Sequence, residues 1–451
     1  MPSANWLNDP NGPIFINGEY HLFYQYNPNG DDWNSIHWGH AKSRDMIYWE
    51  HLPVALTPSL EKNEHHCFSG STVINDNGDP VIFYTSVGAG GRNQTNGAEQ
   101  WMAVGSKDLI SWNKYRQNPI MTLDIHEEIP IREWRDPFVW KEDDTWYMVL
   151  GGSCQGRGCV LIYRSFDLIR WEFLNVLDQG TKGVWECPSF FVLQDKYVLI
   201  YSPDQPDDYR VRYKIGAILN DFRFHTEFEG IIDFGGKEGY YAPTTFLDRQ
   251  GRRILLGWMP ETARGDFKDI QGWSGVHAIP RVLSLKNNRL LIEPIPEMQI
   301  LRKNEYSIGS LTVTGFLNIE AQGKAMEIIL VTEKAEEPFA VKFFRSPDGE
   351  EETVLWIDPK AEKVLLDRSK SSLYHGTHNF AIEAKLTKKT NGKYRVHIFF
   401  DYSTIEVFIN GETSLSARVY PKREDSINVQ IYSENRLSIH SLHTWNLKPV
   451  W

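Results

Sequence analysis

A repeated motif is the feature of this sequence that most restricts its fold. Residues 43–49 (SRDMIYW) recur with the same serine, aspartate and tryptophan positions at 106–112 and 165–171, and in degenerate form at 220–224. The aspartates of these four copies lie 63, 59 and 54 residues apart. A strand-rich unit of this length matches one four-stranded blade of a β-propeller, and about 290 residues would hold five blades.

Short aromatic and β-branched runs indicate an all-β fold. Examples are residues 20–26, 81–85, 146–150 and 197–201, and turns rich in Gly, Asn, Asp and Pro separate them. The sequence predicts no long amphipathic helix before residue 290. A solenoid of stacked strands is the alternative, and the long, hairpin-like units disfavour it.

The pattern changes near residue 293 and predicts two domains. We expect a five-bladed β-propeller over residues 1–292, a linker punctuated by proline over 293–304, and a C-terminal β-sandwich over 305–451. The C-terminal part contains shorter alternating strands and repeats none of the acidic motifs described next. We therefore interpret it as a packing domain.

Three acids lie beside a proline, and they occur at one phase of the repeat. Asp9, Asp136 and Glu186 belong to the segments DPNG, RDP and ECP. Each acid precedes the aspartate of one copy of the repeat, Asp9 by 36 residues, Asp136 by 31 and Glu186 by 35. Ser69 precedes the aspartate of the remaining copy by 39 residues. Equivalent positions on the innermost strands of a propeller converge on its central channel. The three carboxylates are therefore predicted to face one site.

Two carboxyl groups at such a site are typical of a glycosidase that retains anomeric configuration. Asp9 suits the role of nucleophile. It lies in a predicted turn before a strand at 13–16, and the turn amides of Asn11 and Gly12 could hold its charge. Glu186 suits the acid, because weakly polar neighbours favour a protonated carboxyl. Asp136 lies beside Arg135, which should keep it ionised for binding substrate hydroxyls. Each acid alone could be a capped turn or a salt bridge, and the shared phase favours the catalytic interpretation.

Other polar and aromatic residues give weaker signals. Gln25 lies among strand aromatics and could bind a sugar hydroxyl, whereas Trp33 and Trp38 could stack on a sugar or fill the core. Ser69 has no nearby His–Asp pair that would make it a nucleophile. The histidines within 64–66 and 37–40 lack zinc-like spacing, so we predict no metal site.

Composition excludes several classes of partner. The net charge of −11 and the pI near 5.7 argue against nucleic acid or an acidic membrane surface, and no apolar run reaches the length of a membrane span. Four cysteines are too few for a disulfide framework; Cys154 and Cys159 could pair, but free thiols are favoured. Only five residues precede Trp6, so we expect a cytoplasmic protein if this start is native and a secreted one if a signal peptide has been removed.

These motifs together resemble the glycoside hydrolase family 32 β-fructofuranosidases, the group of invertases, exo-inulinases and levanases. Residues 6–12 resemble the motif of the family's nucleophile, 135–137 its transition-state-stabilising motif and 186–188 its acid/base motif. Segments 23–28, 68–71, 240–243 and 272–275 resemble its other signatures. Leu7 departs from the more usual methionine.

The resemblance implies a five-bladed propeller joined to a sandwich, with no cofactor. It implies retaining hydrolysis of terminal β-D-fructofuranosyl residues of sucrose, inulin or levan. The residues it places around the fructose are Asn8, Gln25, Trp33, Phe68, Ser69, Arg135, Asp136, Glu186, Tyr241 and Trp258.

Three alternatives share these motifs. A fructosyltransferase would pass the same fructosyl intermediate to another sugar, a non-catalytic propeller would only bind fructan, and an arabinanase-type enzyme would act on a pentose. The sequence leaves the oligomeric state open.

Overall fold

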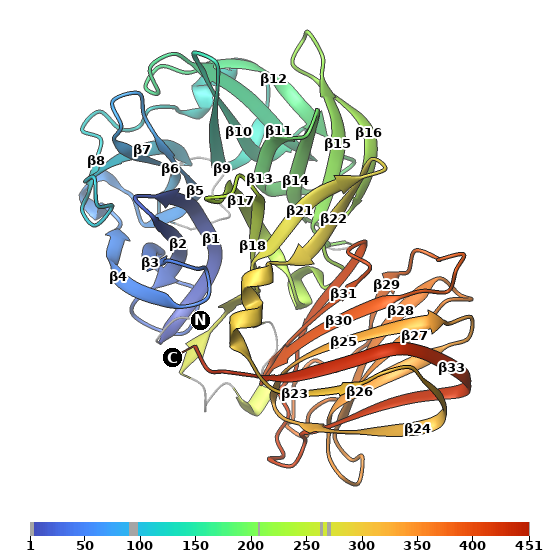
Figure 1. Ribbon diagram of the computed structural model, residues 1–451. Helices are drawn as coiled ribbons and strands as arrows, with labels where there is room; N and C mark the ends of the chain where they lie inside the picture. The colour runs from blue at the N-terminus through green and yellow to red at the C-terminus, as the bar shows by residue number, and fades with distance from the viewer. Residues whose placement is uncertain (1–3, 90–97, 206–207, 262–264, 268–271, 451) are drawn as a thin grey trace. The chain divides into compact units, whose positions relative to one another are not determined.

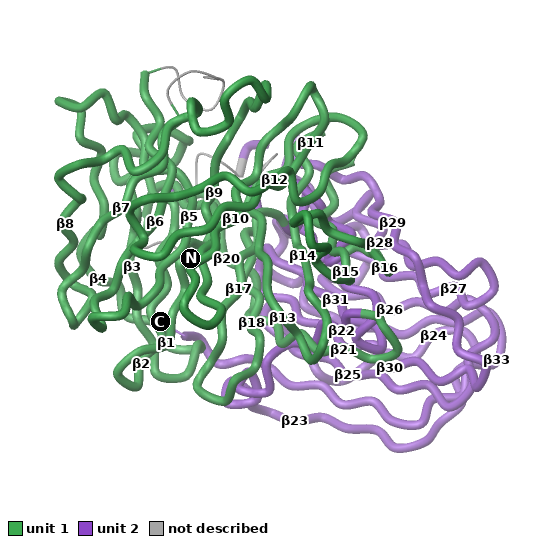
Figure 2. The backbone as a smooth tube through the Cα atoms, turned by 90° about the horizontal axis from the view of Figure 1, so that it is seen from above, with its two compact units in different colours: residues 1–231, 241–258, 273–289 green, residues 232–240, 259–272, 290–451 purple. Residues whose placement is uncertain are grey.

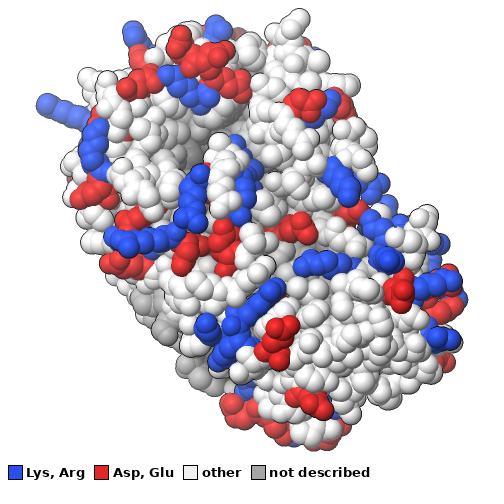
Figure 3. All heavy atoms as spheres, viewed as in Figure 1, with Lys and Arg blue, Asp and Glu red and all other residues white. Residues whose placement is uncertain are grey.

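The computed structural model of the protein describes residues 4–89, 98–205, 208–261, 265–267 and 272–450 (Figure 1). Its contacts divide it into two compact units, coloured separately in Figure 2. The first comprises residues 1–231, 241–258 and 273–289; the second comprises 232–240, 259–272 and 290–451. Two short segments within the first 292 residues thus group with the C-terminal unit. Within the described residues, no helix is long and apolar enough to cross a bilayer. Figure 3 shows Lys and Arg side chains interspersed with Asp and Glu side chains over one face of the molecule.

Twenty strands form five antiparallel four-stranded blades, seen in Figure 1. In chain order they are β1 (Asn5–Ile16), β2 (Glu19–Asn27), β3 (His37–Ser43), β4 (Trp49–Leu56); β5 (His66–Ile74), β6 (Pro80–Val87), β7 (Glu99–Gly105), β8 (Trp112–Lys114); β9 (Ile131–Glu142), β10 (Thr145–Cys154), β11 (Arg157–Ser165), β12 (Glu172–Gln179); β13 (Val184–Leu193), β14 (Lys196–Asp204), β15 (Arg212–Ile218), β16 (Phe224–Ile231); and β17 (Tyr241–Leu247), β18 (Arg253–Met259), β21 (Arg281–Lys286), β22 (Arg289–Pro294).

The first strand of each blade lies on the inside of a closed ring. Strand β1 contacts β5 and β17, β9 contacts β5 and β13, and β13 contacts β17. Five inner strands that meet their neighbours in this cyclic order make a five-bladed propeller. The predicted fold of this part is confirmed.

The repeated motif forms the turn between the third and fourth strands of a blade. In the first copy, Ser43 Oγ accepts the backbone N–H of Met46 at 2.9 Å, and Asp45 accepts the N–H groups of Ile47 and Tyr48. The indole of Trp49 donates to the carbonyl of Met46 at 3.0 Å. These local bonds hold Met46 at a left-handed φ of 63°. The serine and aspartate are therefore turn residues and not part of a site.

The other copies repeat this geometry. Leu109, Leu168 and Phe222 have φ values of 61°, 65° and 61° at the same position. The indoles of Trp112 and Trp171 donate to the carbonyls of Leu109 and Leu168. Local turn chemistry explains why this part of the repeat is visible in the sequence.

Aromatic side chains fill the space between neighbouring blades. Phe23 and Trp38 of the first blade form one cluster with Tyr84 and Trp101 of the second, and all four are almost completely buried. Trp38 is thus a core residue. The four cysteines are free thiols. Burial of such large rings is the main favourable term that holds the blades together.

A short strand outside the blades pairs with the beginning of β1. Strand β19 (Trp273–Ser274) runs parallel to Asn5 and Trp6, and β20 (Val276–His277) pairs with β18. The ring of His277 donates from Nε2 to the carbonyl of Asn8 over 3.0 Å. The segment after the fifth blade's second strand therefore fixes the backbone next to Asp9.

The second unit is a β-sandwich, as predicted. After η6 (Pro296–Leu301), its strands are β23 (Arg302–Ile308), β24 (Leu311–Gln322), β25 (Ala325–Lys334), β26 (Phe339–Arg345), β27 (Glu352–Asp358), β28 (Lys363–Lys370), β29 (Ile382–Lys385), β30 (Arg395–Asp401), β31 (Thr404–Ile409), β32 (Thr413–Arg418) and β33 (Asn428–Leu447). The first half of β33 pairs with β26 and its second half with β25. This long strand thus continues from one layer into the other, with an apolar core between the layers.

Candidate active site

All five inner strands carry a β-bulge at the same level. The register with the second strand of each blade shifts at residues 7–10 of β1, 67–70 of β5, 135–138 of β9, 186–189 of β13 and 241–244 of β17. Asp9, Ser69, Asp136, Glu186 and Tyr241 lie within these five segments. Because a bulge redirects a side chain and locally ends strand pairing, the five together form a polar site in the channel.

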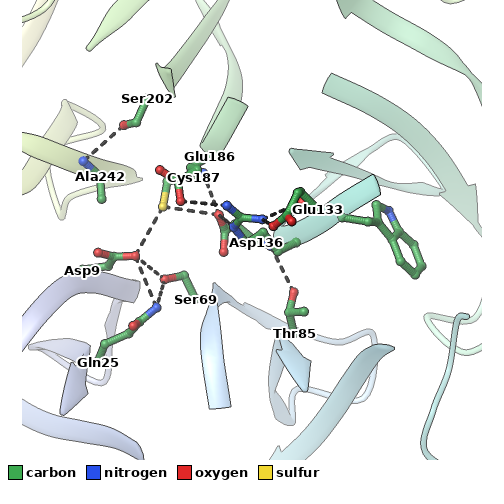
Figure 4. A network of polar contacts seen from close by, with 12 residues as sticks. Asp9, Gln25, Ser69, Thr85, Glu133, Asp136, Glu186, Cys187, Ser202 and Ala242 are labelled. Carbon is green, nitrogen blue, oxygen red and sulfur yellow. Dashed lines mark hydrogen bonds and ion pairs between the residues drawn. The ribbon is translucent and has the colours of Figure 1, made fainter. Parts of the chain in front are cut away.

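Asp9 is held by side chains from four strands, and Figure 4 shows three of them, Gln25, Ser69 and Cys187, around its carboxylate. Ser69 Oγ donates to its Oδ2 over 2.6 Å, Gln25 Nε2 lies 3.3 Å from the same oxygen, and Asn8 Nδ2 donates to Oδ1 over 2.9 Å. The Cys187 thiol lies 3.5 Å from Oδ2. Burial raises the pKa of Asp9, and the bonds from Ser69, Asn8 and Cys187 oppose that rise.

Two expectations for Asp9 are wrong. The DPNG segment does not form a turn before a strand; it lies inside β1, which runs without interruption from Asn5 to Ile16. The groups that donate to the carboxylate are side chains, and not the amides of Asn11 and Gly12. The bulge at residues 7–10 supplies the bend that the sequence attributes to a turn.

Asp136 is almost completely buried beside Arg135. Its backbone N–H donates to Thr85, its Oδ2 accepts the N–H of Cys187 over 2.9 Å, and its φ is 66°. Burial raises the pKa of Asp136 to about 7; Arg135 opposes this, whereas the charges of Asp9 and Glu186 add to it. The expectation that Arg135 would keep this acid ionised is therefore wrong for the unliganded site, because burial outweighs one neighbouring cation.

Arg135 joins three carboxylates in one network. Its guanidinium donates to Glu186 Oε1 over 2.9 Å and to Glu133 Oε2 over 2.9 Å, and lies 4.0 Å from Asp136. Tyr241 donates its hydroxyl to the other oxygen of Glu186 over 2.5 Å. Both oxygens of Glu186 are thus positioned by residues of neighbouring blades, so the carboxyl group has a defined orientation.

Cys187 connects the acids. Its Sγ lies 3.5 Å from Oδ2 of Asp9 and 3.5 Å from Oδ2 of Asp136, and Figure 4 shows it between them. Burial raises its pKa well above the usual value, and the charges of Asp136 and Asp9 add to this effect. The sulfur is therefore a thiol that donates to carboxylates, and not a thiolate nucleophile.

The predicted aromatic residues divide into two groups. Trp33, which is 36% exposed, stacks on His66 with ring centroids 4.8 Å apart and meets Phe68 edge-on. Phe68 directly precedes Ser69, so this group lies next to the donors of Asp9. Trp258 instead packs edge-on against Trp6 at 5.9 Å. It also packs against the cluster that contains Leu7, two residues before Asp9, and no described contact joins it to the carboxylates.

Three contributors to the site were missed or undervalued from the sequence. Cys187 was considered only as a weakly polar neighbour of Glu186, and Glu133 was not considered. Trp6 positions Asn8, because its indole donates to Asn8 Oδ1 over 2.7 Å. The signal was present for Glu133, since an acid two residues before Arg135 on a strand can share its cation.

Acids and histidines elsewhere have other roles. Glu64 is fully buried and accepts bonds from Lys114, Tyr84 and the amide of Ser59. Within the part of the chain that the structure describes, no three His, Cys, Asp or Glu side chains are grouped to hold a metal ion.

Comparisons with known proteins agree with this geometry. The family model for the glycosyl hydrolases family 32 N-terminal domain matches residues 1–294, and the model for the family 32 C-terminal domain matches residues 297–446. The chain is 34% identical to a sucrose-6-phosphate hydrolase of Escherichia coli over 98% of its own length and 91% of the relative's.

Two further relatives extend the comparison. The chain is 31% identical to a levanase of Bacillus subtilis, over 100% of this chain and 70% of that one. The structure superimposes on a family 32 β-fructofuranosidase of Bombyx mori with a TM-score of 0.82 and 29% identity, covering 100% of this chain and 93% of that one. The chain therefore belongs to glycosyl hydrolase family 32 and is a glycosidase of the β-fructofuranosidase type.

Proposed function

We propose that the protein releases terminal β-D-fructofuranosyl residues from sucrose and from fructans by double displacement, with Asp9, Glu186 and Asp136 as its catalytic carboxylates. The observation that carries this proposal is the convergence of the three acids, from three inner strands, around Cys187. The names of the relatives support the substrate class. One is a sucrose-6-phosphate hydrolase, another is a levanase, and a variant of the Bombyx mori enzyme has been solved with sucrose.

Asp9 is the nucleophile of this proposal. A carboxylate that attacks C2 of the fructosyl unit must be ionised and held in one orientation. Ser69 and Asn8 serve both requirements, because each donates to one of its two oxygens and each opposes the rise in pKa that burial causes. Substrate entry then brings the anomeric carbon to a charge that is already oriented, which lowers the cost of reaching the transition state.

Glu186 is the acid and then the base. In the first step it protonates the oxygen of the leaving sugar, and in the second it removes a proton from the water that attacks the fructosyl-enzyme. Arg135 and Tyr241 hold its two oxygens in place. Asp136 holds fructose hydroxyls, and those hydroxyls supply donors that favour its ionised form when substrate is bound.

The test compares sugar release from sucrose, sucrose 6-phosphate, inulin and levan by the wild-type chain and by Asp9→Asn and Glu186→Gln variants. We expect each variant to lose at least about a thousandfold in kcat on every substrate that the wild type cleaves. Glu172→Gln, which removes an exposed carboxylate on β12, is the matched control and should retain wild-type activity. Near wild-type activity of a folded Asp9→Asn protein would overturn the assignment. Mainly oligosaccharide products at high sucrose would identify a transferase.

A further inference from the structure

One outward face of the sandwich carries a row of aromatic side chains across neighbouring strands. The register pairs Phe316 of β24 with Tyr432 of β33, Tyr432 with Ala340 of β26, and Ala340 with Trp356 of β27. The alternate residues of these strands, such as Ile319, Ile431, Val341 and Leu355, belong to the buried core. The row therefore points away from the core, because side chains alternate between the faces of a sheet.

Phe316, at one end of the row, is largely exposed, whereas Tyr432 and Trp356 are partly buried. Phe316 is 64% exposed and packs on Tyr432 with ring centroids 4.6 Å apart, while Trp356 stands almost perpendicular to Tyr432 at 5.9 Å. Ala340, between Tyr432 and Trp356 in the register, is completely buried, and its small side chain lets the two rings meet. The strands that carry Phe316 and Trp356 are three spacings apart, about 14 Å, and both rings lean towards Tyr432, so that their centroids are no more than about 10.5 Å apart. This length suits a short oligomer better than a single sugar.

A polar row runs parallel to the aromatic one. Asn318 pairs in register with Gln430, and Gln430 pairs with Lys342. A hollow of about 470 Å³ lies over this row, bordered by Phe316. Gln430 lines it and is only 8% exposed; its Nε2 donates to Asn318 over 2.7 Å, but its Oε1 has no hydrogen-bond partner among the residues that the structure describes. A buried acceptor without a partner is costly, and a hydroxyl donor in the hollow would satisfy it.

The charges around the hollow favour an uncharged ligand. Glu352 lies 3.2 Å from both Lys342 and Arg345, and Asp348 pairs with Arg423 at 2.7 Å. Lys370 is the one charged lining residue that shows no ion pair within the described part of the chain. Because both signs of charge are present and almost all are paired, the surface is not built to hold a polyanion.

We propose that this face of the sandwich, defined by Phe316, Tyr432, Trp356, Asn318, Gln430 and Lys342, is a second carbohydrate-binding site that holds a fructan chain. Stacking of the apolar faces of sugar units on the aromatic row and hydrogen bonds from hydroxyls to the polar row are the two interactions that recognise a neutral polyhydroxyl chain. The choice of fructan rests on the proposed function. A site that retains the polymer raises the local concentration of chain ends for the same molecule.

The experiment is affinity gel electrophoresis of the full chain as the Asp9→Asn variant, so that the polymer is not consumed, with inulin or levan in the gel. Phe316→Ala and the double variant Phe316→Ala/Trp356→Ala are compared in this background. The matched control is Tyr402→Ala, since Tyr402 is 65% exposed and lies in the β30–β31 turn of the same unit. We expect inulin or levan to retard the parent and the control, and the double variant to bind about tenfold more weakly.

Several outcomes would overturn the inference. These are no retardation of the parent, equal retardation of the double variant, equal retardation by dextran, or stronger retardation by polygalacturonate. When the double variant is made in the enzyme that retains Asp9, its kcat/KM on sucrose should equal that of the wild type. Its kcat/KM on long fructans should be lower than that of the wild type. Sucrose hydrolysis with no effect of these variants on polymer binding would refute this site and leave the proposed function intact, whereas a wild type that cleaves none of the substrates would refute the proposed function.

Discussion

The hydroxyl of Tyr241 donates a hydrogen bond to Oε2 of Glu186 over 2.5 Å, from an inner strand of the adjacent blade. Burial raises the pKa of Tyr241 well above its usual value, and the charge of Glu186 adds to this rise. The phenol therefore remains a donor at every pH at which the enzyme can be assayed. The orientation of the proposed acid thus depends on a blade other than its own.

Replacement of Tyr241 by phenylalanine should lower kcat with little change in KM. The ring and its packing remain, but Glu186 loses the donor that holds one oxygen, so we expect a loss of roughly ten- to a hundredfold. Initial rates on sucrose check this. Tyr24→Phe is the matched control, because it also removes a buried hydroxyl, one that contacts His51 and none of the acids. Equal losses in both variants would show that Tyr241 acts only through stability.

Replacement of Ser69 by alanine should move the acidic limb of the pH–rate profile upward. Ser69 donates to Asp9 and lowers its pKa against the effect of burial, so its removal raises the pKa of the proposed nucleophile further. Activity is lost as pH falls through that pKa, and the limb should shift by about one pH unit. Ser71→Ala, on the same strand, removes a buried hydroxyl that accepts the N–H of Val139. The prediction is wrong if both profiles match the wild type.

Replacement of Asp136 by asparagine should stabilise the unliganded protein at alkaline pH. The pKa of Asp136 is raised to about 7, so the folded protein holds a proton that the unfolded chain releases near pH 4. This contribution to stability is complete below pH 4 and lost as pH rises through 7.

Thermal unfolding of both proteins at pH 5 and pH 8 tests this prediction. The free energy of unfolding of the variant, relative to that of the wild type, should be higher at pH 8 than at pH 5 by on the order of 1 kcal/mol, although the variant loses activity. An equal difference at the two pH values would show that Asp136 is already ionised at pH 5 and that its pKa is not raised.

Replacement of Lys114 by methionine should be strongly destabilising. Glu64 is fully buried and would keep a carboxylate without its cation, a change that typically costs about 3–5 kcal/mol. Lys114→Met/Glu64→Gln should recover most of the loss, because the remaining group is neutral. Lys196→Met, which breaks a half-exposed pair with Glu227, should cost less than about 1 kcal/mol. Thermal unfolding of the three variants separates these effects.

The blade architecture and the shared position of the three acids in the repeat can be predicted from the sequence alone. The Ser43, Asp45 and Trp49 pattern is readable because its bonds are local, within three residues of one another. Once the repeat is found, Asp9, Asp136 and Glu186 occupy equivalent positions in their units. The inner strands form a ring, so residues at equivalent positions lie close together. Both inferences need only periodicity and turn chemistry, which each segment carries in its own residues.

The contacts that hold the acids become visible only in the folded protein. Ser69 is 60 residues from Asp9 and Cys187 is 178 residues away, so neither contact follows from local pattern. The same reason explains the error at Asp136. Its neighbour Arg135 is visible in the sequence, whereas burial and the charges of two distant acids are not. The pKa of an acid at this site depends on burial and on several charged or hydrogen-bonding groups, and only the closed propeller brings these groups close to one another.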